Sequence, residues 1–465
     1  MSEYVGKNLL DKWYPLAVDA KNGGYHTDIA YDWKIEPVQH KMIVTQARHV
    51  WTASKAAIFF NNKTYADAAI HGFDFLRNKM WDTKHGGFYQ MRDGRGETTD
   101  YLGFFGEKRT YGNAFAVYAL AALYELTGDP AILDFAREVF EWIEEHSYDR
   151  AQKGYFQFLT SDGRHFDRWD NYKTEAYDEP ELGFKDQNSS IHLLEAYAEL
   201  YRLWPYPYLG EKLAELLRLV RDVITTSAGY MNLFFHNDWS PVSFRNAPDE
   251  IRERNYRLDH VSFGHDYETA YLMLEASYAL GNQNDAGTLS TSRKMVDHAI
   301  ANGWDAEAGG FFDAGYYFSG EDKCTIITST KNWWAQAEAL NILLMMSKIF
   351  PEDSTYRDHF ERQWTYVKKF LLDYEHGDWF EGGLDKQPHL RRGPKGHIWK
   401  CNYHTARAMM SCIKMLAGDD YKLNSESHWF KTMKRESDKF IAHWQETKAS
   451  DSINGPFTRS VGGAN

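Results

Sequence analysis

Residues 86–125 read GGFYQMRDGRGETTDYLGFFGEKRTYGNAFAVYALAALYE, a glycine-aromatic turn followed by a stretch with the apolar periodicity of a helix. The same unit recurs along the chain. Its six turns lie at Gly23-Gly24-Tyr25, Gly86-Gly87-Phe88, Gly154-Tyr155-Phe156, Gly229-Tyr230, Gly309-Gly310-Phe311 and Gly377-Asp378-Trp379-Phe380. The helix-like stretches that follow begin near Met42, Tyr111, Asn188, His265, Asn332 and Tyr403. Starts about 70 residues apart leave room for two helices plus loops, so six helical hairpins predict an all-α fold, an (α/α)6 barrel.

Two kinds of helical stretch alternate. Residues 115–126, 191–203, 271–280 and 337–346 are apolar on most of their circumference, as expected of an inner ring buried on both sides. Residues 132–145, 212–224, 291–301 and 356–374 are amphipathic and charged, as expected of an outer ring. Each hairpin needs a neighbour to bury its apolar face, so we expect one catalytic barrel domain over residues 1–445 and a polar C-terminal tail over 446–465.

Two long connections interrupt this pattern. Residues 159–187 and 232–264 combine many aspartate, asparagine, arginine and aromatic residues with little periodicity. Connections of this length in a compact domain are usually functional or disordered. Their aromatic content favours ordered loops at the mouth of a site.

Composition excludes several classes of protein. The 465 residues carry a net charge of -13 spread along the chain, which argues against a nucleic-acid or anionic-membrane partner. The three cysteines form no C-x-x-C pair, so neither a disulfide framework nor a thiol-rich metal site is expected. No apolar run approaches the ~18 residues of a membrane span, and the start lacks the features of a signal peptide. We expect a cytoplasmic protein, either a monomer or a homodimer.

Polar residues gather in the first turns of the expected inner helices. They are Arg48 in the first, His192 in the third, His265 and Glu268 in the fourth, Trp334 and Glu338 in the fifth, and His404 and Arg407 in the sixth. The inner helices of such a barrel all run in one direction, so these residues should meet at one mouth. Trp333, Trp334 and Trp399 should rim that cavity, and Tyr111 and Asn188, at the starts of two inner helices, are further candidates for contacts with a substrate.

The spacing of these residues supports a shared site. His265 and Glu268 are three apart, as are His404 and Arg407, while Trp334 and Glu338 are four apart, so each pair shares a helix face. A carboxylate beside a histidine can orient the ring and tune its basicity, and converging helix N-termini favour a developing oxyanion.

Other interpretations remain open at this point. Each histidine taken alone could be a cap or a hydrogen-bonded core group, and Glu338 could pair with Arg48 or Arg407 as a structural ion pair. Three histidines could bind Zn²⁺, but no further ligand set accompanies them, so no metal is expected.

Segments across nearly the whole chain resemble the N-acylglucosamine 2-epimerase superfamily, in its cellobiose 2-epimerase and mannose 2-epimerase branch. The segments are TQARHVWTASKA (45–56), RTYGNAFAVYALAALYE (109–125), NSSIHLLEAYAELYR (188–202), SFGHDYETAYLMLEA (262–276), KNWWAQAEALN (331–341) and IWKCNYHTARAM (398–409). The G-H-D-x-E text at 264–268 and the K-C-x-Y-H-x-x-R text at 400–407 are its specific signatures.

The resemblance implies a role for each matching residue. His265 and His404 would be the general acid/base pair, His192 and Arg48 would contact sugar oxygens, Trp334 and Trp399 would stack on sugar rings, and Glu268 would support its histidine. The implied reaction opens an aldose ring and inverts C2 through a cis-enediolate, exchanging gluco and manno configurations without a cofactor. Two histidines on opposite sides of a flat intermediate suit that chemistry, because each works near neutral pH.

The substrate is not fixed by the resemblance. Where several cellobiose epimerases read M-N-T-H, this chain has Gln187-Asn188-Ser189-Ser190, and loop 159–187 differs. These departures leave two choices open, the reducing-end glucose of a disaccharide such as cellobiose and the free monosaccharide.

Three other functions compete with epimerisation. A mannose–fructose isomerase would share the enediolate. An inverting glycoside hydrolase would need two carboxylates ~6.5–9.5 Å apart, with Glu268, Glu338, Asp186 and Glu381 as candidates, and leaves three histidines unexplained. A non-catalytic carbohydrate- or protein-binding toroid would have no use for paired histidines.

Overall fold

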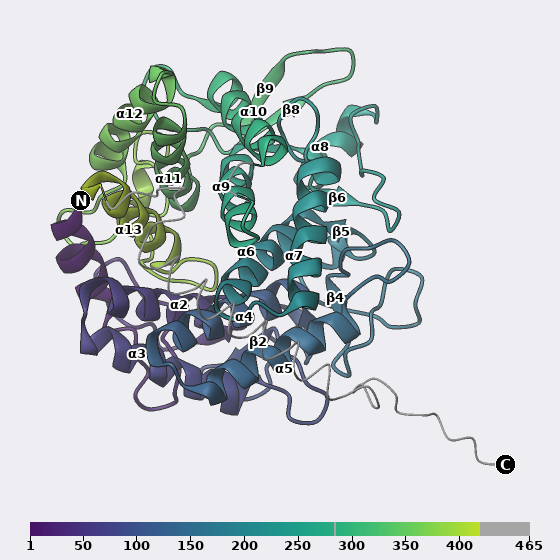
Figure 1. Ribbon diagram of the computed structural model, residues 1–465, viewed down its shortest axis with the longest axis vertical. Helices are drawn as coiled ribbons and strands as arrows, with labels where there is room; N and C mark the ends of the chain where they lie inside the picture. The colour runs from purple at the N-terminus through teal and green to yellow at the C-terminus, as the bar shows by residue number, and fades with distance from the viewer. Residues whose placement is uncertain (283–284, 419–465) are drawn as a thin grey trace.

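The helices of the structure, a computed structural model that describes residues 1–282 and 285–418, form two concentric rings (Figure 1). The inner ring consists of α2 (Ile43–Phe60), α4 (Thr110–Thr127), α6 (Gln187–Leu203), α9 (Phe263–Ala279), α11 (Trp333–Ile349) and α13 (Tyr403–Ala417). The outer helices are α3 (Lys63–Phe75), α5 (Pro130–His146), α7 (Pro207–Leu219), α10 (Ala286–Gly303) and α12 (Ser354–Phe370). The expected (α/α)6 barrel is confirmed, whereas the boundary at 445 and the tail at 446–465 lie outside the described residues.

Burial distinguishes the two rings as the sequence predicted. Every residue of α4 from Thr110 to Leu123 is buried, and Gly128 ends the helix with a φ of 66°. The outer helix α5 begins after Asp129, whose side chain accepts the N–H of Ala131, and only one of its faces is buried. Successive inner helices pack against one another, and α13 packs against α2 to close the ring. None of the described helices combines the length and apolar character needed to cross a bilayer.

The start of the chain completes the outer ring. A π-helical segment (Tyr4–Leu10) packs beside α13, and α1 (Asp11–Trp13) follows it directly in the chain. The hydroxyl of Tyr4 donates to the carbonyl of Asp378 over 2.7 Å, and the hydroxyl of Tyr65 on α3 donates to Asp11 over 2.6 Å. This segment therefore joins the last turn of the barrel to its first outer helix.

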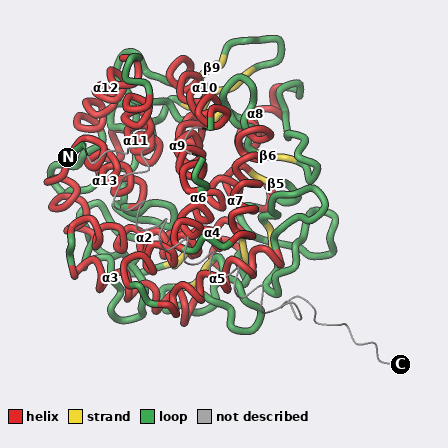
Figure 2. Tube along the Cα trace, in the orientation of Figure 1, coloured by secondary structure: helices red, strands yellow, loops and turns green. Residues whose placement is uncertain are grey.

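Short antiparallel strands, which the all-α prediction did not include, tie successive repeats together. The pairs are β1 (His40–Met42) with β2 (Met91–Asp93), β3 (Lys108–Arg109) with β4 (Phe158–Leu159), β5 (Lys185–Asp186) with β6 (Phe234–Phe235), and β7 (Val261–Ser262) with β8 (Ala314–Tyr317), which also pairs with β9 (Cys324–Thr328). Strands β1, β3, β5 and β7 directly precede inner helices, and helices still dominate the trace (Figure 2). The pairs therefore hold neighbouring helix N-termini at one mouth.

The two long connections are ordered, but one contains an element that the sequence pattern did not reveal. Residues 249–259 form helix α8, whose only buried residue is Leu258. Because almost all of its remaining residues are polar, this helix has no apolar periodicity to detect.

The glycine-aromatic turns have a common structure. In the second, Trp81 and Phe88 form an antiparallel bridge around Gly86 and Gly87, which have φ values of 68° and 74°. A Cβ on Gly87 would lie 2.5 Å from the indole of Trp142, so the position requires glycine for both conformation and space.

Buried ion pairs fasten five of these turns to the strand or loop before an inner helix. The pairs are Lys41–Asp19 at 2.8 Å, Lys108–Asp82 at 2.8 Å, Lys185–Asp149 at 2.7 Å, Lys331–Asp305 at 2.8 Å and Lys395–Asp373 at 2.6 Å. In the fourth repeat, the corresponding positions hold Thr226 and Val261, so the two charges are missing together. A buried charge without its partner is strongly unfavourable, which explains why both are absent.

Replacing Asp19 with alanine is expected to lower the free energy of unfolding by about 3–5 kcal/mol, because Lys41 would remain buried without its counter-charge. Burial alone would raise the pKa of Asp19, but hydrogen bonds from Lys41 and Asn22 outweigh it and lower the pKa to about 2. The stabilisation is therefore complete above the unfolded pKa of about 3.9 and is lost as the pH falls towards 2. Urea unfolding at pH 7 and at pH 3 measures both effects.

The exposed pair of Lys63 and Asp67 on α3 provides the control. Asp67→Ala should change stability by no more than about 0.5 kcal/mol, because a solvated pair contributes little. Equal losses in Asp19→Ala and Asp67→Ala would contradict the structural role assigned to the buried pairs.

Candidate active site

A cavity opens at the mouth where the inner helices begin. Four residues predicted to contact a substrate or act on it, Tyr111, Asn188, His265 and Trp399, line this cavity. The two long connections also contribute, through residues such as Tyr177, Glu181 and Arg257. The two connections are ordered loops, as expected, and their residues line this cavity.

The two histidines of the predicted acid/base pair face the same tryptophan. The ring centroid of Trp334 lies 4.8 Å from that of His265 and 5.7 Å from that of His404. His265 projects from the first turn of α9 and His404 from the first turn of α13. The barrel thus brings residues 139 positions apart to one indole ring.

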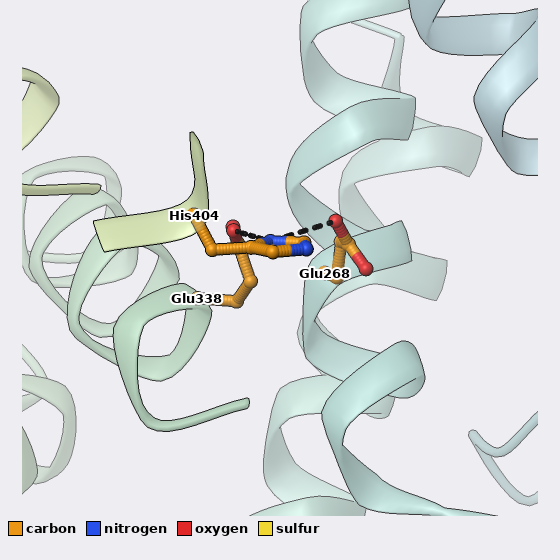
Figure 3. A group of neighbouring side chains, drawn as sticks. All are labelled: Glu268, Glu338 and His404. Atoms are coloured by element: carbon orange, nitrogen blue, oxygen red, sulfur yellow. Dashed lines mark hydrogen bonds and ion pairs between the residues drawn. The ribbon is translucent and has the colours of Figure 1, made fainter. Parts of the chain in front are cut away.

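The two histidines differ in what holds their Nδ1 atoms. His404 Nδ1 lies 2.7 Å from Glu338 on α11 and 3.9 Å from Glu268 on α9 (Figure 3). His265 Nδ1 lies 2.8 Å from the hydroxyl of Ser262. The prediction that Glu268 supports His265 is wrong, because Glu268 turns across the barrel towards α13.

The guanidinium of Arg407 gathers three buried carboxylates. Its Nη2 lies 2.7 Å from Glu268 and 2.8 Å from Glu338, and its Nη1 forms a close contact with Glu195 on α6. The ion pair between Glu338 and Arg407 was one of the two structural pairings considered from the sequence. All four residues are at most 5 % exposed, so the cluster is buried among the inner helices.

Sequence reasoning missed Glu195. Its carboxylate lies 2.8 Å from Nδ1 of His192 and accepts the hydroxyl of Tyr403 over 2.6 Å. The spacing H-x-x-E in residues 192–195 is the same as in 265–268, so the signal was present. The pair at 192 and 195, rather than the one at 265 and 268, is the one that forms a hydrogen bond.

Arg48 lies between the second and last inner helices. Its Nη2 donates to the hydroxyl of Tyr111 over 3.0 Å, and its Nη1 donates to the carbonyl of Trp399 over 3.3 Å. Its guanidinium carbon lies 4.4 Å from the ring centroid of Phe115 and 5.1 Å from that of Tyr403. These contacts hold a positive charge beside two groups that line the cavity.

Trp333 does not join the site in the predicted way. It is buried against His397, with ring centroids 5.9 Å apart, and the histidine in turn pairs with Glu381 at 3.0 Å. Neighbouring residues on a helix point about 100° apart, so Trp333 and Trp334 face in different directions. It therefore serves the packing around His397.

Burial controls the protonation of the acid/base pair. It lowers the pKa of His265 to about 3, assisted by the positive potential of His192, His260, His404 and Arg48. Burial and Arg48 also lower the pKa of His404 well below its usual range. Both rings are therefore neutral near pH 7, as a general base must be.

Within residues 1–282 and 285–418, one group of side chains has the spacing of metal ligands. It consists of Glu268, Glu338 and His404, whose donor atoms all lie within 4.8 Å of one another (Figure 3). Both carboxylates already contact the same guanidinium nitrogen of Arg407. A cation at this position would meet that positive charge, so the donor set does not fit a metal site.

Comparison with known proteins identifies the family of the chain. The model of the N-acylglucosamine 2-epimerase (GlcNAc 2-epimerase) family matches residues 23–408. A cellobiose 2-epimerase from Bacteroides fragilis is 29 % identical over 423 residues, which cover 90 % of this chain and 97 % of the relative. The structure of a cellobiose 2-epimerase from Spirochaeta thermophila has a TM-score of 0.73 at 28 % identity, covering 90 % of this chain and 97 % of the other. A D-mannose isomerase from Marinomonas mediterranea is 22 % identical over 406 residues, covering 87 % of this chain and 94 % of the relative. The chain therefore belongs to the N-acylglucosamine 2-epimerase family.

Proposed function

We propose that this protein, a carbohydrate epimerase of the isomerase class, inverts C2 of a ring-opened aldose with His265 and His404 on opposite faces of the substrate. One neutral histidine removes the C2 proton, and the electrons move into the C1 carbonyl to give a cis-enediolate. The other histidine takes a proton from solvent and delivers it to the opposite face of C2, while the first releases its proton to solvent. The observation that carries this proposal is the placement of both imidazoles against Trp334.

The chemistry of the Nδ1 partners makes each histidine competent as a base. Burial raises the pKa of Glu338, and Arg407 opposes this rise. When the carboxylate is ionised it can only accept hydrogen bonds, so Nδ1 of His404 then carries the proton and Nε2 keeps a lone pair. The hydroxyl of Ser262 can accept from Nδ1 of His265 or donate to it. With Nδ1 donating to Ser262, Nε2 of His265 has a lone pair that can take a proton, and the same hydrogen bond is kept in the protonated ring.

Arg48 and Tyr111 are suited to the oxyanion of the intermediate. The guanidinium and the phenol are already hydrogen bonded to each other, and Tyr111 lines the cavity. Burial raises the pKa of Tyr111 to about 12, so its hydroxyl remains a donor throughout the working range. Donors fixed in place before the reaction stabilise developing charge most effectively. No redox cofactor takes part in the proposal, because C2 has the same oxidation state in substrate and product.

The reducing-end glucose of a β-1,4 disaccharide such as cellobiose is the proposed substrate. The cavity continues from His265 to Glu181 and Arg257 on the long connections, which leaves polar surface for a second ring. The similarity to a cellobiose 2-epimerase from Bacteroides fragilis agrees with this choice. Free mannose or glucose is the alternative substrate, and mannose–fructose isomerisation is the alternative reaction, favoured by the similarity to a D-mannose isomerase.

Glycoside hydrolysis is disfavoured by the state of the four candidate carboxylates. Glu268 and Glu338 share Arg407, Asp186 accepts the N–H of Ser189 over 2.6 Å at the start of α6, and Glu381 pairs with His397. Each is committed to a structural partner, which leaves no pair poised across a glycosidic bond.

Incubation with cellobiose, mannose and glucose in D2O, followed by NMR, tests the proposal. We expect a gluco/manno exchange with deuterium incorporated at C2. Fructose from mannose would establish the isomerase alternative, and free glucose from cellobiose would establish a hydrolase. Absence of C2 exchange with all three sugars would refute the enediolate proposal for these substrates.

The epimerisation rate is expected to stay nearly constant as the pH falls from 8 to 6. A lowered histidine pKa means that the neutral base form persists to lower pH, and the pKa of His265 is lowered to about 3. The acid limb of kcat/KM should therefore lie below the usual histidine value of about 6.5. Initial rates across this range, with enzyme stability checked at each pH, measure the profile; an acid limb centred at 6.5 would contradict it.

A further inference from the structure

Glu195 occupies a position between three groups of the site. Its Oε2 lies 2.8 Å from Nδ1 of His192. Its Oε1 accepts a hydrogen bond from the hydroxyl of Tyr403 over 2.6 Å and another from Nη1 of Arg407. The residue is 5 % exposed, and its partners come from the same helix and from α13 on the other side of the barrel.

We propose that Glu195 is a positioning residue for the epimerase: it fixes His192 in the tautomer whose Nε2 lone pair faces the substrate, and it joins that histidine to Arg407. The inference rests on the proposed function for its kinetic consequences, whereas the tautomer itself is a property of the resting protein.

The assignment of the two oxygens determines the tautomer. Oε1 is already used by Tyr403 and Arg407, so Oε2 is the atom available to His192. A carboxylate oxygen only accepts, which requires a proton on Nδ1 and leaves Nε2 as an acceptor. Burial would raise the pKa of Glu195, but Arg407 and the hydrogen bonds of His192 and Tyr403 lower it to about 2. The carboxylate therefore stays ionised throughout the working range.

Two aromatic rings also pack against the imidazole ring of His192. Its centroid lies 5.2 Å from that of Tyr111 and 4.7 Å from that of Phe115, both on α4. With these rings beside the imidazole and Nδ1 bound to Glu195, a flip that exchanges the two nitrogens would break the hydrogen bond to Glu195. Nε2 can then accept a sugar hydroxyl, or donate to an oxyanion once it is protonated.

Several other charged or titratable groups act on His192 or lie close to it. They are Asp186 just before α6, Glu195 on α6, Tyr111 on α4, His265 on α9, Glu338 on α11, and His404 and Arg407 on α13. Among the hydrogen bonds of the described residues, Glu195 is the group that holds Nδ1 of His192. A change at Glu195 should therefore affect His192 directly and the other groups through Arg407.

Glu195→Gln separates positioning from simple packing. The single carbonyl oxygen of the amide will stay with Arg407 and Tyr403, so its NH2 group will face His192 and force Nδ1 to become an acceptor. We expect imidazole ¹⁵N NMR to report Nδ1–H for His192 in the wild type and Nε2–H in the variant, with the signal assigned through His192→Asn. Because a wrong tautomer can reduce turnover by 10²–10⁴-fold, we expect kcat to fall by about 10²-fold.

Three further variants make the test specific. Glu195→Asp keeps two acceptor oxygens and should restore the Nδ1–H tautomer and part of the rate. In the His192→Asn background, Glu195→Gln should cost much less than in the wild type, because the two residues act as a unit. Glu199→Gln, one turn further along α6 where Glu199 binds Lys55 and Arg202, should leave the tautomer and the rate unchanged.

The NMR measurement, the rate of Glu195→Gln and the double-mutant comparison can each contradict the inference. A wild-type His192 that carries its proton on Nε2 refutes it without any variant at 195, even if Glu195→Gln fails to fold. A folded Glu195→Gln enzyme within threefold of the wild-type rate, or fully additive losses with His192→Asn, also refutes it. Failure of the wild type to epimerise any sugar would instead remove the proposed function, while the NMR measurement would still decide the tautomer.

Discussion

His404→Asn and His265→Asn are each expected to reduce epimerisation by about 10²–10⁴-fold, the usual contribution of a positioned general acid or base. The two variants should differ in a second property. If the histidines flank opposite faces of C2, each variant still has one base, and that base can remove the C2 proton from one epimer only. Each variant should therefore exchange deuterium into one epimer without converting it to the other.

Separate incubations of each epimer in D2O measure this. One variant should label the gluco form alone and the other the manno form alone, with inversion lost in both. His359→Asn, a change at a half-buried histidine of the outer helix α12, provides the control and should retain full activity. Labelling of the same epimer by both variants would contradict the opposite-face arrangement, and full activity in either would remove that histidine from the acid/base pair.

Arg407→Met is expected to lower the free energy of unfolding by about 3–5 kcal/mol, because Glu195, Glu268 and Glu338 would lose the guanidinium that they share. Arg407→Lys should recover only part of this loss, since one ammonium cannot span three carboxylates in the manner of a planar guanidinium. Activity should also fall in both variants, because Glu338 would lose the contact that fixes it against His404.

The sign of the pH effect identifies the cause. In Arg407→Met the unpaired buried carboxylates acquire raised pKa values, so the native state binds more protons than the unfolded state below neutrality. The stability deficit should therefore shrink as the pH is lowered from 7.5 to 5, as measured by urea unfolding. Lys55→Met removes a charge that binds Glu125 and Glu199 on neighbouring inner helices, and Arg202 still binds both carboxylates, so its loss should be smaller. A deficit in Arg407→Met that is the same at both pH values would contradict the account.

The missed features share a physical origin. Helix α8 has one buried residue, so no apolar period marks it, and the paired strands at the mouth are two to five residues long. His49 on α2 is fully buried and stacks on Tyr25 with centroids 4.6 Å apart. Its neighbours come from the first glycine-aromatic turn and from Tyr14, and no pattern within α2 identifies them.

The barrel itself and the residues at its mouth follow from local information. The recurrence of a glycine-aromatic turn before an apolar helix depends on backbone conformation and on one-dimensional periodicity, and both can be read along the chain. The choice of partners does not follow in this way. Glu268 binds Arg407 rather than His265, Glu338 holds His404, and Glu195 holds His192, because side chains of facing helices meet across the barrel axis. Spacing along one helix defines which residues share a face, but only the closed ring sets which face lies opposite, since that depends on the packing of all six hairpins.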